Sequence, residues 1–591
     1  IKQETTNRKE ESQRGNKKMK VRSLIISFAL MLAVTAASFP SWKETETVSQ
    51  HMFRIPVNVK DPSNADNGIG GGWTCVGCTA LIFLVEQYVQ IHSMEIDTFI
   101  SDHLCSLFPE EKINNTCNAL VKIWGPKLVS VLAEGPDPDD ACNKLKLCVD
   151  PKCNLVGPDA AAQLDINFSS QWEEYASHAG DFDPDVSGPI DWLKSLISKV
   201  FDKHLPLVDI DGDKFSSELA QLRGYHWRGK DCNDLDKNVY PGRKTKPTEV
   251  FDGDYSCNGI HGVNPDTKKS YKEELCADSN QMGVAVFGDS AGAHFELPPQ
   301  WFNASEWSAE AFHGALGKAL DEFDIPYRST YTGYVDSTEA IPVRSIYKYL
   351  LQKNLCNHRD FQNLGVNGGA SDDYDNTLAF ARDQQNDHPV LVFLELVGND
   401  VCGHHMTEPD AFYAGVVKIL RYIDSVTPAG SHVVMVGLAD GRVLYDTLHD
   451  RYHPIGVKYP DFYEFLLCTG SSPCYGWMNP DDSVREKTYQ RATELSAQMP
   501  KIIENEKFDN FDMQYYPFPI KEIMSKWTAA GGDPAKLIEP VDGFHPSQIA
   551  NAMFADWIWE SLQKDQPEWV GKDNPNNEVI TKLFGNQGGY Q

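Results

Sequence analysis

The chain of 591 residues carries a formal net charge of −30 at pH 7, and 41% of its residues are hydrophobic. This length is more than one hydrophobic core organises, so two or more domains are expected, and the apolar fraction excludes a disordered chain. Because binding to nucleic-acid phosphates needs an excess of Lys and Arg, the acidic charge also argues against a nucleic-acid partner.

The first segment of the chain, residues 1–37, has the pattern of a cleaved targeting sequence. Basic residues at 17–22 precede an apolar run from Leu24 to Ala36, which ends among small residues. A basic start, a short apolar middle and a small-residue end are typical of a secretory signal peptide, and we expect translation to start at Met19. The pattern predicts passage through the secretory pathway, with secretion or delivery to the lysosome.

All fourteen cysteines lie beyond this segment, which favours disulfide bonding in an oxidising compartment. Six of them fall between residues 75 and 148, and the segments between them have helical periodicity. The opening Cys-x2-Cys could suggest zinc, but zinc needs a second close Cys/His pair, and the signal peptide favours disulfides. Glycosylation sequons occur at Asn114, Asn167 and Asn303.

Residues 154–190 are polar and acidic, and we interpret them as a linker that could be cut to leave two disulfide-linked chains. In the following region, 191–280, two acidic loops start at residues 209 and 231 and predict a calcium site. Calcium takes roughly six to eight oxygen ligands, and carboxylates so close together would otherwise repel one another. The first loop resembles the opening of an EF-hand loop but lacks its final glutamate, and two solvated acidic turns are the alternative. The candidate ligands are Asp209, Asp211, Asp213, Phe215, Asp231, Asn233, Asp234, Asp236 and Asn238.

Basic residues surround these loops. They could bind the phosphate groups of a lipid headgroup, although the interpretation we prefer is that they balance the local acidic charge. The residues are Arg223, Arg228, Lys230, Arg243 and Lys244.

From residue 281 to 570, short apolar runs alternate with helical periodicity, which predicts an α/β domain. We expect strands at 284–287, 390–397 and 432–437, and helices at 309–323, 339–354, 411–425 and 546–563.

Two of these strands end in short polar turns that predict a catalytic site. Gly288-Asp289-Ser290 follows the first strand, and Gly398-Asn399-Asp400 follows the second. A serine nucleophile needs a base oriented by an acid, and Asp542 and His545 offer both. The Asn399 side chain could donate to an oxyanion. Each motif alone is a common turn, but together they predict a serine hydrolase.

With the segment from Asn363 to Gly368, these motifs resemble the four sequence blocks of the GDSL/SGNH hydrolases. The resemblance implies a flavodoxin-like parallel sheet. It also implies that Ser290 is the nucleophile, that His545 is the base and that Asp542 orients it. The oxyanion hole would consist of the N–H groups of Ser290 and Gly368 and the Asn399 amide.

The six clustered cysteines resemble those of the saposin B-type fold over residues 73–153, a small helical module that holds lipid. The apolar helix faces would then meet lipid, whereas the alternative is that they pack on each other or on the hydrolase. The resemblance implies the pairs Cys75–Cys148, Cys78–Cys142 and Cys105–Cys117. For the other cysteines we expect Cys232–Cys257, Cys276–Cys356, Cys402–Cys474 and a tether between Cys153 and Cys468.

A saposin-like module, a calcium-rich segment and a GDSL hydrolase in this order resemble the acyloxyacyl hydrolase family. The most telling stretches are 288–295, 223–230 and 231–243. This resemblance implies removal of secondary fatty acyl chains from the lipid A of bacterial lipopolysaccharide through an acyl-enzyme. Two alternatives stay open: a phospholipase or lysophospholipase with the same triad, and a lipid-binding or transfer protein without catalysis.

Overall fold

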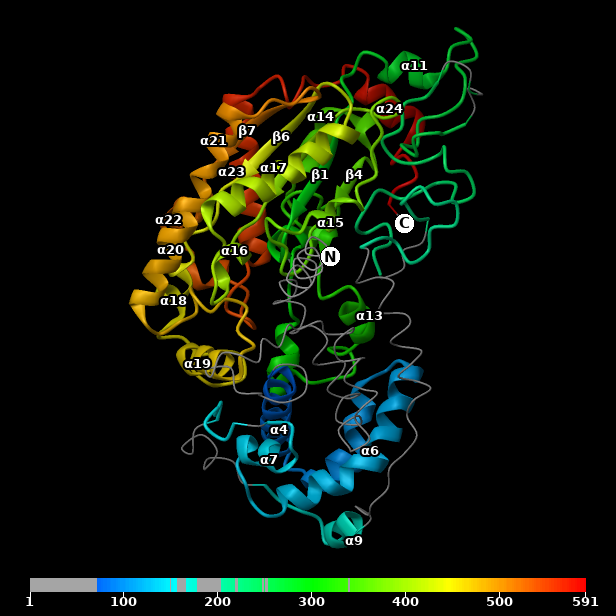
Figure 1. Cartoon of the computed structure of the whole chain (residues 1–591). Helices are drawn as coiled ribbons and strands as arrows, with labels where there is room; N and C mark the ends of the chain where they lie inside the picture. The colour runs from blue at the N-terminus through cyan, green and yellow to red at the C-terminus, as the bar shows by residue number, and fades with distance from the viewer. Residues whose placement is uncertain are drawn as a thin grey trace, which may run out of the picture.

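The computed structural model describes residues 72–148, 150–156, 166–177, 204–217, 222–246, 249, 253–338 and 341–590. The expected signal peptide and much of the expected linker lie outside the described residues. Figure 1 shows a small helical module, in blue, below a larger domain with a central sheet. The order is that expected from the sequence, with the module first and the hydrolase after it.

The N-terminal module consists of helices held together by disulfides. Its long helices are α4 (Trp73–Ile91) and α6 (Glu111–Leu132), and α7 (Pro138–Lys144) packs on α4. Asp137 caps α7 by accepting the N–H of Asp140, and Pro138 at the first helical position has the φ angle that a helix needs. The shorter elements are α5 (Ile96–Thr98), the π-helical turn η2 (Phe99–His103), the 3-10 turn η3 (Leu104–Leu107) and α9 (Trp172–Ser177).

All fourteen cysteines are paired, and the pairs are those expected from the sequence. Three pairs lie within the module: Cys75–Cys148, Cys78–Cys142 and Cys105–Cys117. The others are Cys153–Cys468, Cys232–Cys257, Cys276–Cys356 and Cys402–Cys474.

The larger domain is built on a parallel five-stranded sheet in the order β4-β1-β5-β6-β7. Taken in chain order, the strands run 2-1-3-4-5, which confirms the flavodoxin-like sheet. Three strands correspond to the predicted runs: β1 (Gly283–Gly288), β5 (Val390–Glu395) and β6 (Ser431–Val436). The edge strands β4 (Phe361–Asn363) and β7 (Phe511–Tyr516) were not predicted, and β2 (Ser337–Thr338) pairs with β3 (Ile341–Pro342) in a separate hairpin.

Alternate residues along the strands face two helical layers, as the period of two in a strand requires. Val284, Val286 and Phe393 pack with α14 (Ile346–Lys353) and α23 (Gln548–Asp565), and Ala285 and Val392 pack with α17 (Pro409–Val426) on the other face. The remaining helices are α11 (Tyr271–Cys276), α12 (Ser290–Ala293), α13 (Ala315–Leu320), α15 (Tyr374–Thr377), α16 (Asn399–Cys402), α18 (Arg442–Leu448), α19 (Tyr459–Thr469), α20 (Asp482–Ser496), α21 (Gln498–Asn505), α22 (Ile520–Ala529) and α24 (Asn577–Phe584). The 3-10 turns are η4 (Pro299–Phe302), η5 (Ala304–Glu306), η6 (Pro326–Arg328), η7 (Leu355–Asn357) and η8 (Pro534–Leu537).

Two helix predictions were too long at their N-terminal ends. The helix expected over 309–323 is α13, which starts only after Gly314, and Gly314 has the left-handed φ of +72° that ends the preceding turn. The helix expected over 339–354 begins at Ile346, because Ser345 caps it by accepting the N–H of Lys348.

The module packs directly on the hydrolase, and the two share one apolar core. The ring of Tyr88 lies near that of Trp307 (5.7 Å between ring centroids), and the ring of Phe108 lies near that of Phe312 (5.2 Å). Helix α4 is long and apolar enough to cross a membrane, yet 67% of that window is buried inside the protein. Much of the apolar surface of α4 therefore packs inside the protein, on α7 and on the hydrolase, as in the alternative named from the sequence. Contact of the module with lipid stays a prediction.

Two domain limits differ from the sequence-based ones. Leu155 and Val156, expected in the linker, are buried, and the Asp139 carboxylate accepts both of their N–H groups at 2.9–3.1 Å. At the other end, α24 lies beyond residue 570 and packs on the Cys276–Cys356 disulfide through Ile580.

Candidate active site

The nucleophile turn joins β1 to α12 at the C-terminal edge of the sheet. The chain leaves β1 at Gly288, and Asp289 caps α12 by accepting the N–H of Ala291 at 2.9 Å. Ser290 is the first residue of α12, at the point where the strand order reverses and where ligands of open α/β sheets bind. A Cβ added at Gly292 would lie 2.8 Å from Oε2 of Glu395, so a larger residue there would displace this carboxylate.

Ser290, His545 and Asp542 form a connected triad. Ser290 Oγ lies 2.6 Å from Nε2 of His545, and Nδ1 of the same ring is hydrogen-bonded to Oδ2 of Asp542. Oδ1 of Asp542 accepts the N–H groups of Phe544 (2.8 Å) and His545 (3.1 Å). All three residues are at most 3% exposed. With Nδ1–H donating to the carboxylate, Nε2 can accept the serine proton.

Glu539 is a buried carboxyl group behind the triad that sequence reasoning missed. Its Oε2 accepts the N–H groups of Val541 (3.0 Å) and Asp542 (2.7 Å). Burial raises the pKa of Glu539 well above its ordinary value, and the charge of Asp542 raises it further. Burial acts in the same direction on Asp542, but the charge and N–H of His545 outweigh it and hold the pKa of Asp542 below its ordinary value. Glu539, Asp542 and His545 are each three residues apart, and this equal spacing is the sequence signal that could have identified Glu539.

Asp289 connects the nucleophile turn to the loop after β5. Its Oδ2 accepts the N–H of Val397 at 2.9 Å and lies 3.2 Å from Nδ2 of Asn399. Burial raises the pKa of Asp289 to about 6, although the N–H of Ala291 and the charge of His545 oppose the shift. From the sequence, Asp289 was only the middle residue of a motif, and its bridging contacts emerge from the fold.

Two of the three expected oxyanion donors, Gly368 and the Asn399 amide, belong to the segments that follow β4 and β5. Asn399 begins α16 and lines the same pocket as Ser290, and its Nδ2 also donates to the carbonyl oxygen of Gly369 at 3.0 Å. Gly368 has a φ of +76°, which glycine adopts without strain. The amide thus ties the Asn399 turn to the glycine loop, and the roles of Gly368 and Asn399 in holding an oxyanion stay predictions.

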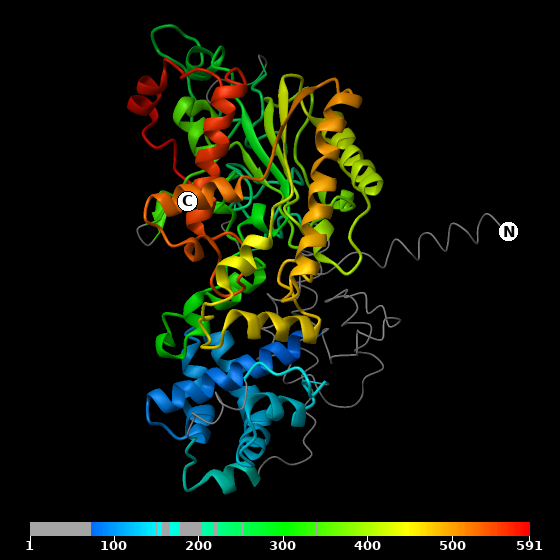
Figure 2. The same ribbon diagram turned by 90° about the vertical axis from the view of Figure 1, so that its left-hand side faces the viewer.

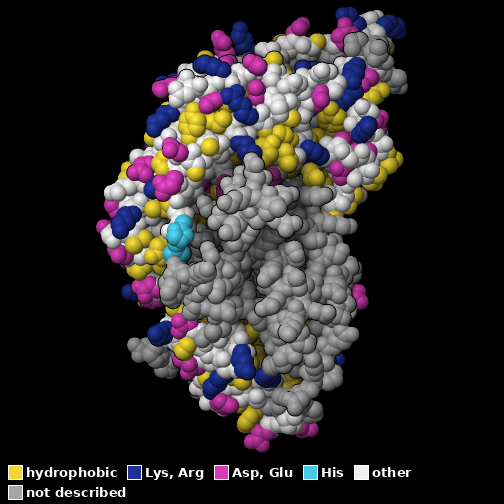
Figure 3. Space-filling view, in the orientation of Figure 1, with side chains coloured by type: hydrophobic (Ala, Val, Ile, Leu, Met, Phe, Trp, Pro, Cys, Tyr) yellow, Lys and Arg dark blue, Asp and Glu magenta, His cyan; other side chains and the backbone are white. Residues whose placement is uncertain are grey.

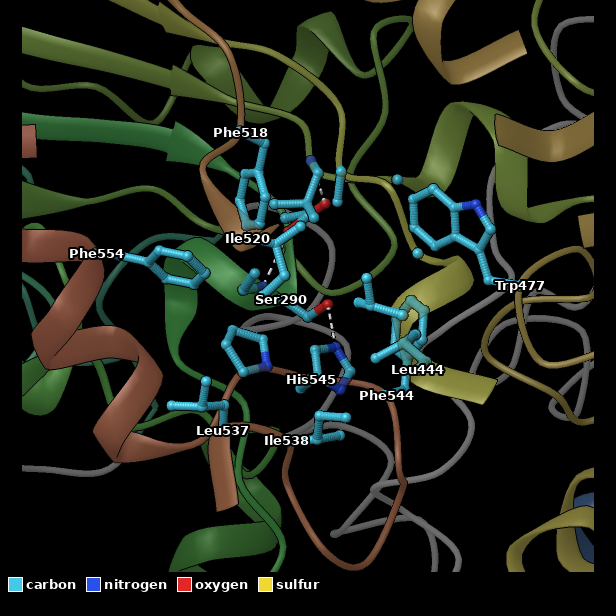
Figure 4. Close-up of a pocket in the computed structure, with 18 of the residues that line it drawn as sticks. Ser290, Leu444, Trp477, Phe518, Ile520, Leu537, Ile538, Phe544, His545 and Phe554 are labelled. Atoms are coloured by element: carbon cyan, nitrogen blue, oxygen red, sulfur yellow. Dashed lines mark hydrogen bonds between the residues drawn. The ribbon is translucent and has the colours of Figure 1, made fainter. Parts of the chain in front are cut away.

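An apolar pocket opens beside the serine hydroxyl (Figure 4). The ring of Trp477 lies against two glycines: a Cβ added at Gly441 would be 2.0 Å from the ring, and one at Gly398 would be 2.4 Å from it. Such walls accept an alkyl chain and exclude water. Prominent among the apolar lining residues are Leu444, Trp477, Phe518, Ile520, Phe544 and Phe554.

The two acidic loops lie against each other, as a shared metal site requires. Oδ1 of Asp234 accepts the N–H of Ile210 at 3.1 Å, which joins the second loop to the first. Asp236 and Asn238 bond to each other at 3.0–3.1 Å, and the N–H groups of Phe215 and Asn233 donate to neighbouring aspartates. Two groups of carboxylates each gather oxygens within 4.8 Å: Asp209, Asp211 and Asp234 form one, and Asp211, Asp213 and Asp231 form the other.

The chemistry of this cluster fits calcium. One carboxylate oxygen each of Asp211, Asp213 and Asp231 is buried without a hydrogen-bond partner. Burial raises the pKa of Asp213 to about 8 and that of Asp231 to about 7, and the neighbouring aspartate charges raise both. Among the described residues, no lysine or arginine forms an ion pair with these aspartates, and such a gathering of oxygen ligands is the donor set that calcium prefers.

The surrounding arginines are not free to bind phosphate, so that hypothesis is wrong for three of them. Arg228 is buried and donates to the carbonyl oxygen of Ala379 at 2.7 Å. Arg223 is also buried, donates to the carbonyl oxygen of Gly365 at 2.9 Å and stacks over a tryptophan ring. Arg243 is buried and forms an ion pair with Glu249. The guanidinium groups of Arg223 and Arg228 hold the segment to the hydrolase instead, and that of Arg243 pairs within the segment.

The three sequons differ in accessibility. The side-chain amide of Asn114 donates to the carbonyl oxygen of Cys105 at 2.6 Å, and that of Asn303 donates to Glu306 at 2.8 Å. Asn167 is exposed. Since a glycan is attached to this amide nitrogen, Asn167 offers the most accessible site, and glycosylation at all three stays a prediction.

Comparison with known proteins agrees with this architecture. Residues 74–167 match the family model of the saposin-like domain, and residues 284–558 match that of the GDSL-like lipase/acylhydrolase. A disulfide-bonded helical module joined to a parallel sheet with a Ser–His–Asp triad defines a two-domain serine ester hydrolase that acts on lipids.

Full-length relatives narrow the class further. The chain is 38% identical to the acyloxyacyl hydrolase of Mus musculus over 544 residues, which cover 88% of this chain and 94% of the relative. It is 38% identical to that of Oryctolagus cuniculus over 548 residues (88% and 94%) and 37% identical to that of Homo sapiens over 559 residues (90% and 96%). The chain belongs to the acyloxyacyl hydrolase family.

Proposed function

We propose that this enzyme removes the secondary, ester-linked fatty acyl chains from the lipid A of bacterial lipopolysaccharide and thereby detoxifies it. The observation that carries the proposal is the Ser290–His545–Asp542 triad beside an apolar pocket, in a chain whose relatives are named for the acyloxyacyl bond. Moving an acyl chain into such a pocket is favourable by about 0.8 kcal/mol per buried methylene.

The chemistry is acyl transfer to Ser290. His545 Nε2 takes the hydroxyl proton as Oγ attacks the ester carbonyl, and Asp542 stabilises the imidazolium that forms. The oxyanion is held by the N–H groups of Ser290 and Gly368 and by the Asn399 amide. His545 then protonates the leaving hydroxyl group, and a water molecule activated by the same ring hydrolyses the acyl-enzyme to release the fatty acid.

The helical module would bring the enzyme to a lipid aggregate or membrane. A two-chain form is compatible with the structure, because a cut within 154–190 would leave Cys153 still bonded to Cys468. The calcium ion proposed at Asp209, Asp211, Asp213, Asp231 and Asp234 would neutralise the acidic loops and hold the segment in place. The signal-like N-terminus and the disulfides support a secreted or lysosomal location.

The test compares the parent enzyme with Ser290→Ala and with Ser525→Ala, an exposed serine on α22 that serves as the matched control. Each is incubated with lipopolysaccharide and, separately, with phospholipid vesicles, and released fatty acids are identified by mass spectrometry. We expect the parent and the control to release only secondary acyl chains, and Ser290→Ala to release none.

Other outcomes have clear meanings. Release from phospholipid but not from lipopolysaccharide would make the enzyme a saposin-equipped phospholipase. Inactivation of lipopolysaccharide by Ser290→Ala without fatty acid release would favour sequestration by a lipid-binding protein.

A further inference from the structure

The catalytic Asp–His turn is held from outside by one short stretch of chain. Three side chains between residues 453 and 463 donate hydrogen bonds to three backbone carbonyl groups in and just before the turn. The donors are Tyr459 Oη to Pro540 (2.5 Å), His453 Nε2 to Val541 (2.5 Å) and Tyr463 Oη to Gly543 (2.6 Å).

Each donor is fixed in the form that can donate. Nδ1 of His453 accepts the N–H of Ile455 at 3.1 Å, so its proton is on Nε2, and burial lowers the pKa of His453 to about 4. Burial raises the pKa of Tyr463 well above its ordinary value, which keeps the hydroxyl protonated. Gly543 has a φ of +62°, and a Cβ there would lie 2.6 Å from the Tyr463 hydroxyl, so glycine permits the close contact.

The same stretch, residues 453–469, is fastened to the saposin-like module. Cys468 on α19 is bonded to Cys153, and Nε2 of Gln87 on α4 donates to the carbonyl oxygen of Ile455 at 3.0 Å. At its end, the carbonyl oxygen of Thr469 would be 1.9 Å from a Cβ added at Gly72. Figure 2 shows α19 lying across the blue helices of the module. The two sets of contacts are therefore on one continuous stretch of chain.

We propose that residues 453–469 are a positioning element through which the seated module sets the geometry of the Asp542–His545 turn. The module thereby contributes to the chemical step, even for a substrate that needs no lipid capture. Tyr459, Tyr463 and His453 are positioning residues because they touch the turn and not the reacting atoms. The idea rests on the serine hydrolase chemistry proposed above.

The test measures Ser290 reactivity with a small soluble fluorophosphonate, which forms an O–P bond at Ser290 and loses fluoride. Because this probe bypasses lipid binding, its second-order rate constant reports only the chemical site. We expect Tyr463→Phe to slow labelling about tenfold and Gln87→Ala about threefold. The control is Tyr452→Phe, a tyrosine of the same region that is 66% exposed, and we expect it to label at the parent rate. Thermal unfolding of each variant shows that the fold is retained.

A double-mutant cycle distinguishes positioning from a general loss of structure. If the module acts through this element, Gln87→Ala combined with Tyr463→Phe slows labelling by less than the product of the two single effects. Labelling of both single variants within twofold of the parent rate, or multiplicative effects in the double variant, would overturn the proposal. A parent chain that the probe does not label at Ser290 would instead contradict the hydrolase function itself.

Discussion

Glu539 and Asp542 are two carboxyl groups, three residues apart, whose surroundings drive their ionisation in opposite directions. The Asp542 carboxylate is hydrogen-bonded to the His545 ring and stabilised by its charge. The Glu539 carboxyl group accepts two backbone N–H groups but has no cationic partner among the described residues. Separated pKa values in a catalytic pair are how one site holds a base and an acid at the same pH. Here Glu539, whose pKa is raised, shapes the turn, and Asp542, whose pKa is lowered, orients the base.

This difference predicts unequal effects of two substitutions at Glu539. Glu539→Gln keeps an oxygen that accepts from Val541 and Asp542 and resembles the neutral acid, so kcat should stay within about threefold of the parent. Glu539→Ala leaves two buried N–H groups unpaired, at about 1 kcal/mol each, and should lower kcat roughly 30-fold. Steady-state kinetics on a soluble ester measures both.

The pH dependence gives a separate check on the same residue. Because the pKa of Glu539 is raised, the parent should lose activity relative to Glu539→Gln as the pH rises and the carboxyl group ionises beside Asp542. A constant ratio of the two activities from acidic to alkaline pH would contradict a neutral Glu539.

At the scale of single elements, the stability of the two acidic loops should depend most clearly on pH and on a bound metal ion. Asp213 and Asp231 have folded-state pKa values of about 8 and about 7, above the ordinary value of 3.8. Stability from a group with a raised pKa is present below the unfolded value and is lost as the pH rises through the folded value. Without calcium, these loops should therefore lose stability between pH 4 and pH 8, where bound calcium would replace the protons.

We predict that calcium raises the melting temperature more at pH 8 than at pH 5. The difference between calcium and chelator is measured by calorimetry on the parent and on Asp213→Asn, which should lose most of it. Asp266→Asn, an exposed aspartate outside the loops, is the matched control and should behave as the parent. An equal calcium effect at the two pH values would show that these carboxylates are not the ligands.

The elements that the sequence predicted correctly are those with a strong local signal. β1, β5 and β6 are central strands with almost every residue buried, so each appears as an apolar run. β4 and β7 are edge strands; β4 has only three residues and β7 is largely half-exposed, so neither shows such a run. α13 was predicted too long because left-handed Gly314 separates it from the turn before it.

At the scale of the whole molecule, the hydrolase and the module are one packed body with many buried acids. On the face shown in Figure 3, acidic and basic side chains are interspersed over the described part of the hydrolase. Inside, burial raises the pKa of Glu86 to about 8 and those of Asp139, Asp289 and Asp387 to about 6. Each of these groups favours the folded state in acid.

We therefore expect the calcium-loaded enzyme to melt at a higher temperature at pH 5 than at pH 8. The stability that these acids contribute is fully present below their pKa values in the unfolded chain, and it is lost as the pH rises through their folded-state pKa values of about 6 to 8. Calorimetry at a series of pH values with saturating calcium measures the trend. A melting temperature that is higher at pH 8 would mean that the acids with lowered pKa values, such as Asp542 and Asp440, dominate instead.

The sequence by itself determined the candidate catalytic residues and the domain order. Ser290, Asp542 and His545 are recognisable because each stands in a short motif next to a helix or strand, and such local motifs can be read from the linear sequence. The cysteine pairs of the module were expected from its resemblance to the saposin fold, since the sequence alone leaves the pairing open, and the other four pairs were expected as well.

Only the tertiary structure decided which groups support that chemistry. Tyr463 is hydrogen-bonded to Gly543, 80 residues away in the chain, and Asp289 is hydrogen-bonded to Val397, 108 residues away. No local sequence pattern predicts either contact. The fold also buried α4 against the hydrolase, although its composition alone would suit a lipid surface. Contacts between distant segments depend on how helices and strands pack, and packing is a property of the whole chain rather than of any motif within it.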